Sequence, residues 1–283
     1  MTVYILWGST YLGIRIAVQT MPPLLFAGVR FLIAGALLCA WRLPIAIRDK
    51  KLPTRDHWRR TLVIGAALLL GGNGGVAFAE TTVPSGLTAL FVSVVPLWMA
   101  LIDRLFYGRK MSATMLAGLV VGFGGVALLI GSPAQGPVSA VGAVVLVVAS
   151  LSWAAGSLYS RGAKLPDDSL LATGMEMLMG GICLIVAASI AGEFAQVHIL
   201  AISAASWIAF AYLVLFGGIV GFSAYLWVIR NAPTALVSTY AYVNPVVAVF
   251  LGWLVLHESL TLRAGIAGAI ILASVAWIVS ARE

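Results

Sequence analysis

The 283-residue chain is 61% hydrophobic and 10% charged, whereas a soluble globular domain carries roughly 25% charged residues. So little charge cannot cover a surface that faces water, which excludes an ordinary soluble domain and predicts a lipid-embedded protein. The net charge of +7 would suit a nucleic-acid partner, but most basic residues lie in short loops between apolar runs, where they set membrane topology. Cys39 and Cys183 lie within apolar runs and form no CxxC motif, so neither a zinc nor a redox site is indicated.

Ten apolar runs approach the length of about 20 residues that a helix needs to cross a membrane. They are continuous rather than alternating, which argues against a β-barrel. In chain order they cover residues 2–18, 24–41, 61–79, 85–102, 113–130, 140–159, 170–191, 207–229, 235–256 and 264–280. The sequence therefore predicts an all-α membrane protein with ten transmembrane helices.

The basic residues are distributed unequally between the two sides of such a bundle. Of the 17 lysines and arginines, 14 fall in loops or at the end of the chain on one side. Arg263 is alone on the opposite side, and Arg15 and Arg30 lie within apolar runs. Because cytoplasmic loops carry the excess of Lys and Arg, we expect both termini to be cytoplasmic.

Residues of rare types recur at a nearly constant spacing, which indicates an internal repeat. The offset is 146 for the earlier matches and 149 for the later ones, as an insertion of three residues before Trp207 would produce. The pairs are Trp7/Trp153, Arg15/Arg161, Gly28/Gly174, Gly35/Gly181, Trp58/Trp207, Pro84/Pro233 and Pro96/Pro245. Five runs per copy is an odd number, so residues 1–131 and 140–283 are predicted to form two inverted five-helix repeats, which are typical of secondary transporters.

The motifs resemble those of EamA-type members of the drug/metabolite transporter superfamily along the whole chain. They are Trp7-Gly8-Ser9-Thr10-Tyr11 with Arg15, Pro22-Pro23, Arg30 and Gly35, then Val83-Pro84-Ser85-Gly86, Val95-Pro96-Leu97 and Tyr242-Val243-Asn244-Pro245. The resemblance implies the ten-helix inverted repeat and a carrier of small metabolites, often an exporter of amino acids across the bacterial inner membrane. Small four-helix relatives have a proton-binding glutamate in their first helix. The first run here has no carboxylate, so proton coupling is not implied.

Polar and aromatic residues inside apolar runs are candidates for substrate binding, because polar groups are costly in lipid. Trp7 and Trp153 are repeat partners and either form paired walls of one cavity or face lipid. Asn73 lies among four glycines, where it either binds substrate or bridges helices. The candidate substrate-binding residues are Trp7, Tyr11, Asn73, Ser93, Trp153, Tyr240 and Asn244.

Charged residues within the runs are candidates for gating or coupling. Arg30 and its repeat counterpart Glu176 place opposite charges at equivalent depths on opposite sides. We expect Arg30, alone or together with Arg15, to pair with Glu80 near the outer mouth, and Glu176 to face Arg161 or Lys164 near the inner mouth. The alternative is that the arginines extend to the lipid headgroups and only stabilise the fold.

Pro96 and Pro245 lie in the middle of equivalent runs. Each removes one backbone hydrogen bond and loosens its helix. Interrupted helices of transporters lie near the binding site at the midplane of the membrane. We therefore expect both prolines to act in gating, and the alternative is a purely structural kink.

The sequence predicts a secondary transporter that exports small metabolites, with amino acids as the first choice and amphiphilic drugs as the alternative. It needs no cofactor or metal, and its partners are the substrate and the inner-membrane bilayer rather than nucleic acid. One chain holds both repeats, so a monomer suffices. A membrane-embedded enzyme is disfavoured because there is no HExxH motif, GxSxG motif or intramembrane aspartate pair. A channel is disfavoured because pores are usually symmetric assemblies.

Overall fold

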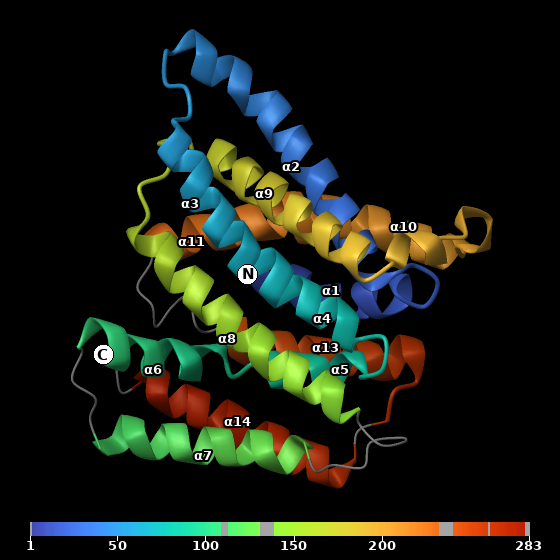
Figure 1. The fold of residues 1–283 in the computed structure, drawn as a ribbon. Helices are drawn as coiled ribbons and strands as arrows, with labels where there is room; N and C mark the ends of the chain where they lie inside the picture. The colour runs from blue at the N-terminus through green and yellow to red at the C-terminus, as the bar shows by residue number, and fades with distance from the viewer. Residues whose placement is uncertain (1, 109–112, 131–138, 232–239, 260, 281–283) are drawn as a thin grey trace.

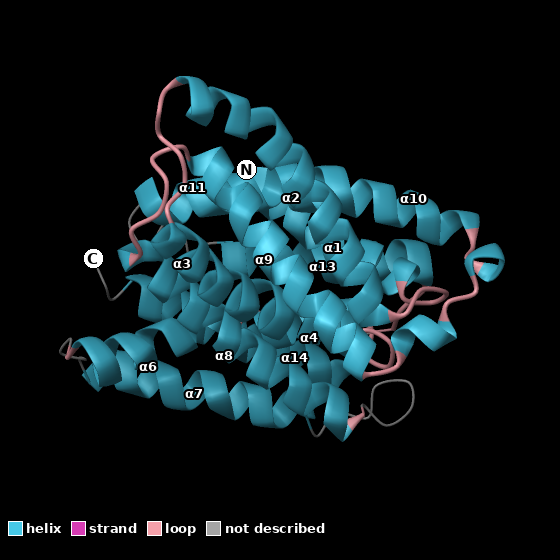
Figure 2. Ribbon diagram, turned by 45° about the horizontal axis from the view of Figure 1, so that its top comes forward, coloured by secondary structure: helices cyan, strands magenta, loops and turns pink. Residues whose placement is uncertain are grey.

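A computed structural model describes residues 2–108, 113–130, 139–231, 240–259 and 261–280, and all regular structure within these ranges is helical (Figures 1 and 2). The first half contains α1 (Thr2–Ala17), α2 (Pro23–Arg48), α3 (Arg55–Gly65), η1 (Ala66–Gly74), α4 (Gly75–Ala79), α5 (Ser85–Val92), α6 (Val95–Tyr107) and α7 (Ala113–Ile130). The second half contains α8 (Ala140–Gly162), α9 (Ser169–Ile190), η2 (Glu193–Gln196), η3 (Ile199–Ala201), α10 (Ala204–Tyr212), η4 (Leu213–Phe222), α11 (Ser223–Asn231), α13 (Tyr240–Leu256) and α14 (Leu262–Ser280).

Six of the helical stretches in the described ranges are long and apolar enough to cross a membrane. Three of them run through consecutive elements: α3 to α4, α5 to α6, and α10 to α11. The six stretches are Pro23–Arg48, Arg55–Ala79, Ser85–Phe106, Ala140–Gly162, Ser169–Ile190 and Ala204–Asn231. Shorter apolar helices cover Leu116–Leu128, Val243–Leu256 and Leu262–Trp277. The fold is therefore an all-helical membrane bundle.

Several helices extend beyond the expected apolar runs, α2 and α3 by the most. Helix α2 continues through Arg42 and Pro44 to Arg48, and α3 begins six residues early because Thr54 and His57 form a capping box that satisfies free N–H groups at its start. The expected run 235–256 is described only from Tyr240 onward. Arg109, Lys110, Pro233 and Arg282 lie outside the described residues.

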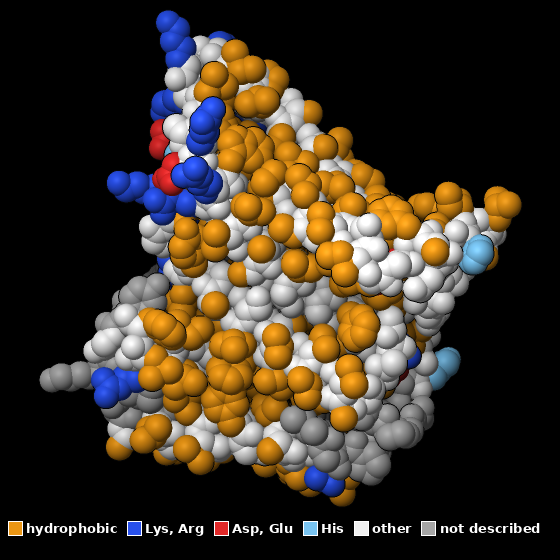
Figure 3. Space-filling model, viewed as in Figure 1, with side chains coloured by type: hydrophobic (Ala, Val, Ile, Leu, Met, Phe, Trp, Pro, Cys, Tyr) orange, Lys and Arg blue, Asp and Glu red, His pale blue; other side chains and the backbone are white. Residues whose placement is uncertain are grey.

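The outer surface matches a lipid environment. Large apolar side chains are exposed along the helices, for example Ile190 and Leu105, and Figure 3 shows them spread across the middle of the molecule. Many of the visible Lys and Arg side chains gather at the left of this view, around the turn between α2 and α3. A bundle with an apolar belt and charged ends is what a membrane-spanning protein requires.

Helices α2 and α9 lie side by side (Figure 1) and approach closely through glycines. A Cβ atom on Gly28 would lie 3.2 Å from the backbone nitrogen of Ile185, and one on Gly174 would lie 3.1 Å from that of Cys39. The repeat offset of 146 relates the two contacts, because it converts Gly28 to Gly174 and Ile185 to Cys39. The two halves therefore pack here through contacts that are related to each other by the repeat offset.

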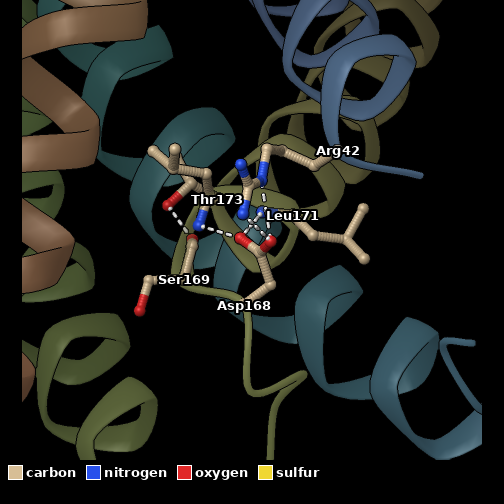
Figure 4. Close-up of polar contacts among 6 residues, drawn as sticks. Arg42, Asp168, Ser169, Leu171 and Thr173 are labelled. Carbon is tan, nitrogen blue, oxygen red and sulfur yellow. Dashed lines mark hydrogen bonds and ion pairs between the residues drawn. The ribbon is translucent and has the colours of Figure 1, made fainter. Parts of the chain in front are cut away.

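The start of α9 is joined to α2 by Asp168 (Figure 4). Its Oδ1 accepts hydrogen bonds from the backbone N–H groups of Leu170 and Leu171 at 3.0 and 3.1 Å, while Oδ2 lies 2.5 Å from Nη2 of Arg42. Partial burial raises the pKa of the Asp168 carboxyl, but the hydrogen bonds from Arg42 and from the backbone outweigh this and leave the pKa below its usual range. One carboxylate thus caps a helix of the second half and binds a cation of the first.

Two segments within the spanning stretches are π-helical. Segment η1 covers Ala66–Gly74 and η4 covers Leu213–Phe222, so the two lie at nearly equivalent positions when the offset of 149 is applied. Long π-helical segments are rare, and single π turns inside α-helices are frequent at functional sites. Both segments contain adjacent glycines, Gly71-Gly72 and Gly217-Gly218, which weaken the competing α-helix.

Candidate functional site

A cavity lies between helices of both halves and encloses about 650 Å³ of empty space, counting its opening. Helix α1 supplies the largest share of the wall, and η1 and η4 each supply two residues. The lining residues are Trp7, Thr10, Tyr11, Ile14, Arg30, Phe31, Gly72, Asn73, Val76, Val92, Ala149, Trp153, Gly217, Phe222 and Tyr240.

Aromatic rings from α1, α8 and α13 form one wall of this cavity, and Tyr225 of α11 packs against them. The ring of Trp7 lies 5.4 Å from that of Trp153 in an edge-to-face arrangement, 4.6 Å from Tyr225 and 5.8 Å from Tyr240, measured between centroids. The Trp153 indole N–H donates to the Tyr225 hydroxyl at 3.2 Å, and that hydroxyl also bonds Ser157 at 2.7 Å. Edge-to-face packing and hydrogen bonds hold the rings in place, so the structure brings the repeat partners Trp7 and Trp153 together rather than turning them to lipid.

Each of these two tryptophans packs on a π-helical segment of the other half. A Cβ atom on Gly72 in η1 would lie 2.7 Å from Cε3 of Trp153, and one on Gly221 in η4 would lie 2.7 Å from Nε1 of Trp7. Any side chain at either glycine would displace the indole. The glycines of η1 and η4 therefore set the position of the aromatic wall.

Arg30 and Asn73 provide the polar part of the cavity. Nη2 of Arg30 donates to Oδ1 of Asn73 at 2.5 Å, and the guanidinium carbon lies 4.4 Å from the ring centroid of Phe31 and 5.4 Å from that of Phe26. Arg30 is 3% exposed, and its Nε has no hydrogen-bond partner. The cavity therefore contains a buried cation that is only partly satisfied.

The expected ion pair between Arg30 and Glu80 does not form. No carboxylate of the described residues lies within 4.0 Å of the Arg30 guanidinium, because this group turns to Asn73. Glu80 is fully buried and neither carboxylate oxygen has a hydrogen-bond partner. Arg15 donates instead to the backbone carbonyl of Glu80. Glu258 lies close enough to interact electrostatically, but its carboxylate caps the start of α5 through the N–H groups of Ser85 and Gly86.

Glu176 has a different partner from the two that the sequence suggested. Its Oε1 accepts a hydrogen bond from Nη2 of Arg230 at 2.8 Å, and the Glu176 side chain is fully buried. Arg161 donates instead to the backbone carbonyl of Ile229 at 3.2 Å, and Lys164 is exposed. The expectation was wrong because α11 packs against α9, and this contact places Arg230, rather than Arg161 or Lys164, beside Glu176.

Ser93 and Asn244 are buried but do not line the cavity. The Ser93 hydroxyl donates to the carbonyl of Leu90 in its own helix at 2.7 Å. When the Asn244 amide is oriented to donate, its nitrogen lies 3.0 Å from the carbonyl oxygen of Tyr4 and 3.3 Å from that of Tyr240. Asn244 therefore connects α13 to α1.

The two candidate prolines differ in their effect on the helix. Pro96 is the second residue of α6, and Ser93 and Val94 separate α6 from α5, so this run is interrupted as expected. Pro245 lies inside the continuous helix α13. The break beside Pro96 follows Val92, which lines the cavity, whereas no break accompanies Pro245 in the described part of its run.

The model of the EamA-like transporter family matches residues 1–131 and 140–280. The chain belongs to this family. Membership makes it a membrane transporter, and an enzyme is correspondingly disfavoured.

Relatives of this EamA-like transporter support the same class. The inner membrane transporter YedA of Escherichia coli (strain K12) is 43% identical over 88% of this chain and 79% of its own length. A probable amino-acid metabolite efflux pump of the same organism is 23% identical over 92% of this chain and 86% of its own length. A solved crystal structure covers 100% of this chain and 96% of its own with a TM-score of 0.69, and at 20% identity it supports the fold alone. The chain is thus a multi-pass transporter of the inner membrane.

The sequence did not indicate some of the residues that line the cavity of this EamA-like transporter, among them Phe31, Phe222 and Thr10. It also did not indicate Tyr225, which packs against Trp7 of the aromatic wall. Phe222 has a signal in the repeat, because subtracting 149 gives Asn73, which was a candidate. For Tyr225 the sequence offers only an aromatic residue within an apolar run. Apolar lining residues look the same in sequence as residues that face lipid.

Proposed function

We propose that this protein exports amino acids, as the main class of its small-metabolite substrates, across the inner membrane by alternating access. The observation that carries the proposal is the cavity itself, which combines an aromatic wall from both halves with a polar pair formed by the buried Arg30 and the half-buried Asn73. Such a site offers polar groups to the ends of a small zwitterion and apolar walls to its side chain. The relative named as a probable amino-acid metabolite efflux pump favours the same class.

The architecture we propose for this carrier is ten transmembrane helices in two inverted repeats, residues 1–131 and 140–283, with both termini in the cytoplasm. The repeat-related contacts of Gly28 and Gly174 and of the two tryptophans with their glycines support this architecture. The excess of basic residues on one side supports the orientation. Two inverted copies that exchange conformations give the inward-open and outward-open forms similar energies, as alternating access requires.

The test is uptake of radiolabelled amino acids into liposomes that contain the purified protein, with and without an imposed pH gradient. We expect saturable uptake, and the gradient comparison shows whether protons are coupled. Trp153→Ala should impair uptake, because it removes part of the cavity wall. The matched control is Trp41→Ala, which removes an indole that is 60% exposed at the surface. If no amino acid enters faster than it enters protein-free liposomes, amino acids are not the substrates.

A further inference from the structure

Arg30 has unused hydrogen-bonding capacity inside the cavity. A guanidinium has five N–H donors in a planar fork, and of these Nη2 bonds Asn73 while Nε bonds nothing. Arg30 is only 3% exposed, and it lines the cavity. The folded chain therefore leaves part of the hydrogen-bonding capacity of the Arg30 guanidinium for a ligand.

A guanidinium does not lose its proton in proteins, so Arg30 carries its charge even when it is buried. A buried charge is costly unless it is paired and hydrogen-bonded. The faces of Phe26 and Phe31 stabilise the cation in part, but an amide oxygen and two rings supply no negative charge. The group that best completes an arginine fork is a carboxylate or a phosphate, through two parallel hydrogen bonds.

Among the described residues, no neighbouring carboxylate takes the place beside the Arg30 guanidinium that a ligand carboxylate would fill. The Glu80 carboxylate interacts electrostatically with Arg30, Arg15 and Glu258, but neither of its oxygens accepts a hydrogen bond. Arg15 bonds the carbonyl of Glu80 and does not line the cavity. Glu258 is occupied at the start of α5. Arg30 is therefore the one formally charged side chain among the cavity-lining residues that the structure describes.

We propose that Arg30 is the anchor for a carboxylate of the substrate, and that the apolar part of the substrate lies against Trp7, Trp153 and Tyr240. This inference rests on the proposed transport of amino acids and names the chemical group that the site recognises. Arg30 is a single cation, so it matches one carboxylate rather than a polyanion. A cation without a carboxylate would meet Arg30 with the same sign of charge. The site therefore selects small monocarboxylates and zwitterions over cationic amphiphiles.

The inference is tested on the unaltered protein with four compounds that share a phenyl ring: L-phenylalanine, 3-phenylpropionate, L-phenylalaninamide and phenethylamine. Their dissociation constants are measured by isothermal titration calorimetry of the detergent-purified protein. Loss of a hydrogen-bonded charge pair in a buried site should weaken binding at least about tenfold. We expect the two carboxylates to bind and the amide and the amine to bind at least about tenfold more weakly. Equal binding of all four, preference for the amine, or binding of none overturns the inference. The amino-acid function is decided separately, by the uptake of amino acids into liposomes.

Three variants locate the anchor. Arg30→Gln should remove the preference for 3-phenylpropionate over phenethylamine, and Arg30→Lys, which keeps the charge without the fork, should keep part of it. Arg15→Gln removes a cation of the same region that does not line the cavity, and its preference should stay within about twofold of the unaltered protein. If Arg30→Gln retains the full preference, or if Arg15→Gln abolishes it instead, Arg30 is not the anchor. Should Arg30→Gln fail to fold, the four-compound series and Arg30→Lys still decide the matter.

Discussion

The two oxygens of Asp168 make separate contacts, which allows its two roles to be measured separately (Figure 4). Asp168→Asn keeps an oxygen that can cap α9 but loses the acceptor for Arg42. Asp168→Ala loses both. The side chains of Arg42 and Asp168 are 25% and 24% exposed, so their ion pair should contribute about 1 kcal/mol, near the upper end for partly exposed pairs. An N-cap contributes about 1 kcal/mol more.

We therefore expect Asp168→Asn to lower the free energy of unfolding by about 1 kcal/mol and Asp168→Ala by about 2 kcal/mol. Equilibrium unfolding by SDS in mixed micelles, followed by circular dichroism, measures both values. Arg42→Gln should cost about as much as Asp168→Asn, and the double variant should cost little more than either single variant. Equal costs for the Asn and Ala variants would refute the capping role. Full additivity of Arg42→Gln with Asp168→Asn would refute the ion pair.

The lowered pKa of Asp168 adds a dependence on pH to this prediction. An aspartate in the unfolded chain has a pKa of about 3.9, and the folded value lies lower. The stabilisation is then fully present above pH about 4 to 5 and is lost as the pH falls through the folded pKa. The difference in stability between the unaltered protein and Asp168→Asn should consequently be constant near neutral pH and shrink below pH about 4. A difference that grows on acidification would contradict this reasoning.

Two further predictions concern the buried ion pair and the aromatic wall. Arg230→Gln leaves the fully buried Glu176 unpaired and should cost about 3–5 kcal/mol of stability in the same assay, whereas Glu176→Gln leaves the partly exposed Arg230 and should cost less; the reverse order would contradict it. Gly72→Ala and Gly221→Ala should each cost about 1–3 kcal/mol and weaken L-phenylalanine binding, because the new methyl group overlaps an indole. Gly124→Ala, which meets nothing within 4 Å, is the control, and equal effects at all three would refute the steric argument.

The sequence predicted the elements whose signal is local. Continuous apolar runs located the helices, and the recurrence of tryptophans paired Trp7 with Trp153, which the structure brings into contact. Tyr11, Asn73 and Tyr240 also lie at the cavity, together with Arg30. Such residues are recognisable because polar and large aromatic groups in the middle of a spanning run need a reason to be there.

The sequence did not predict side-chain partners correctly where the pairing depends on which helices are neighbours. Glu176 pairs with Arg230 because α11 lies against α9, and no spacing within the chain indicates that contact. Ser93 satisfies its hydroxyl within its own helix, which is as common for a serine in an apolar helix as a role in binding. The sequence also did not indicate the π-helical segments. They consist almost entirely of glycine and apolar residues, so no alternation of polar and apolar positions distinguishes a π-helical turn from an α-helical one.

The two π-helical segments place residues in the cavity wall whose position depends on the local hydrogen-bond pattern. If a turn with i→i+5 hydrogen bonds reverts to the i→i+4 pattern, the helix beyond it advances by one residue, or about 100° around its axis. In η1 such a step would exchange Asn73 for a neighbouring residue at the cavity, and in η4 it would do the same for Phe222. In both patterns the backbone N–H and C=O groups are paired within the helix, as lipid demands. Each half of the molecule thus holds, at nearly equivalent places, a segment in which a change of hydrogen-bond pattern would change the residue that faces the cavity.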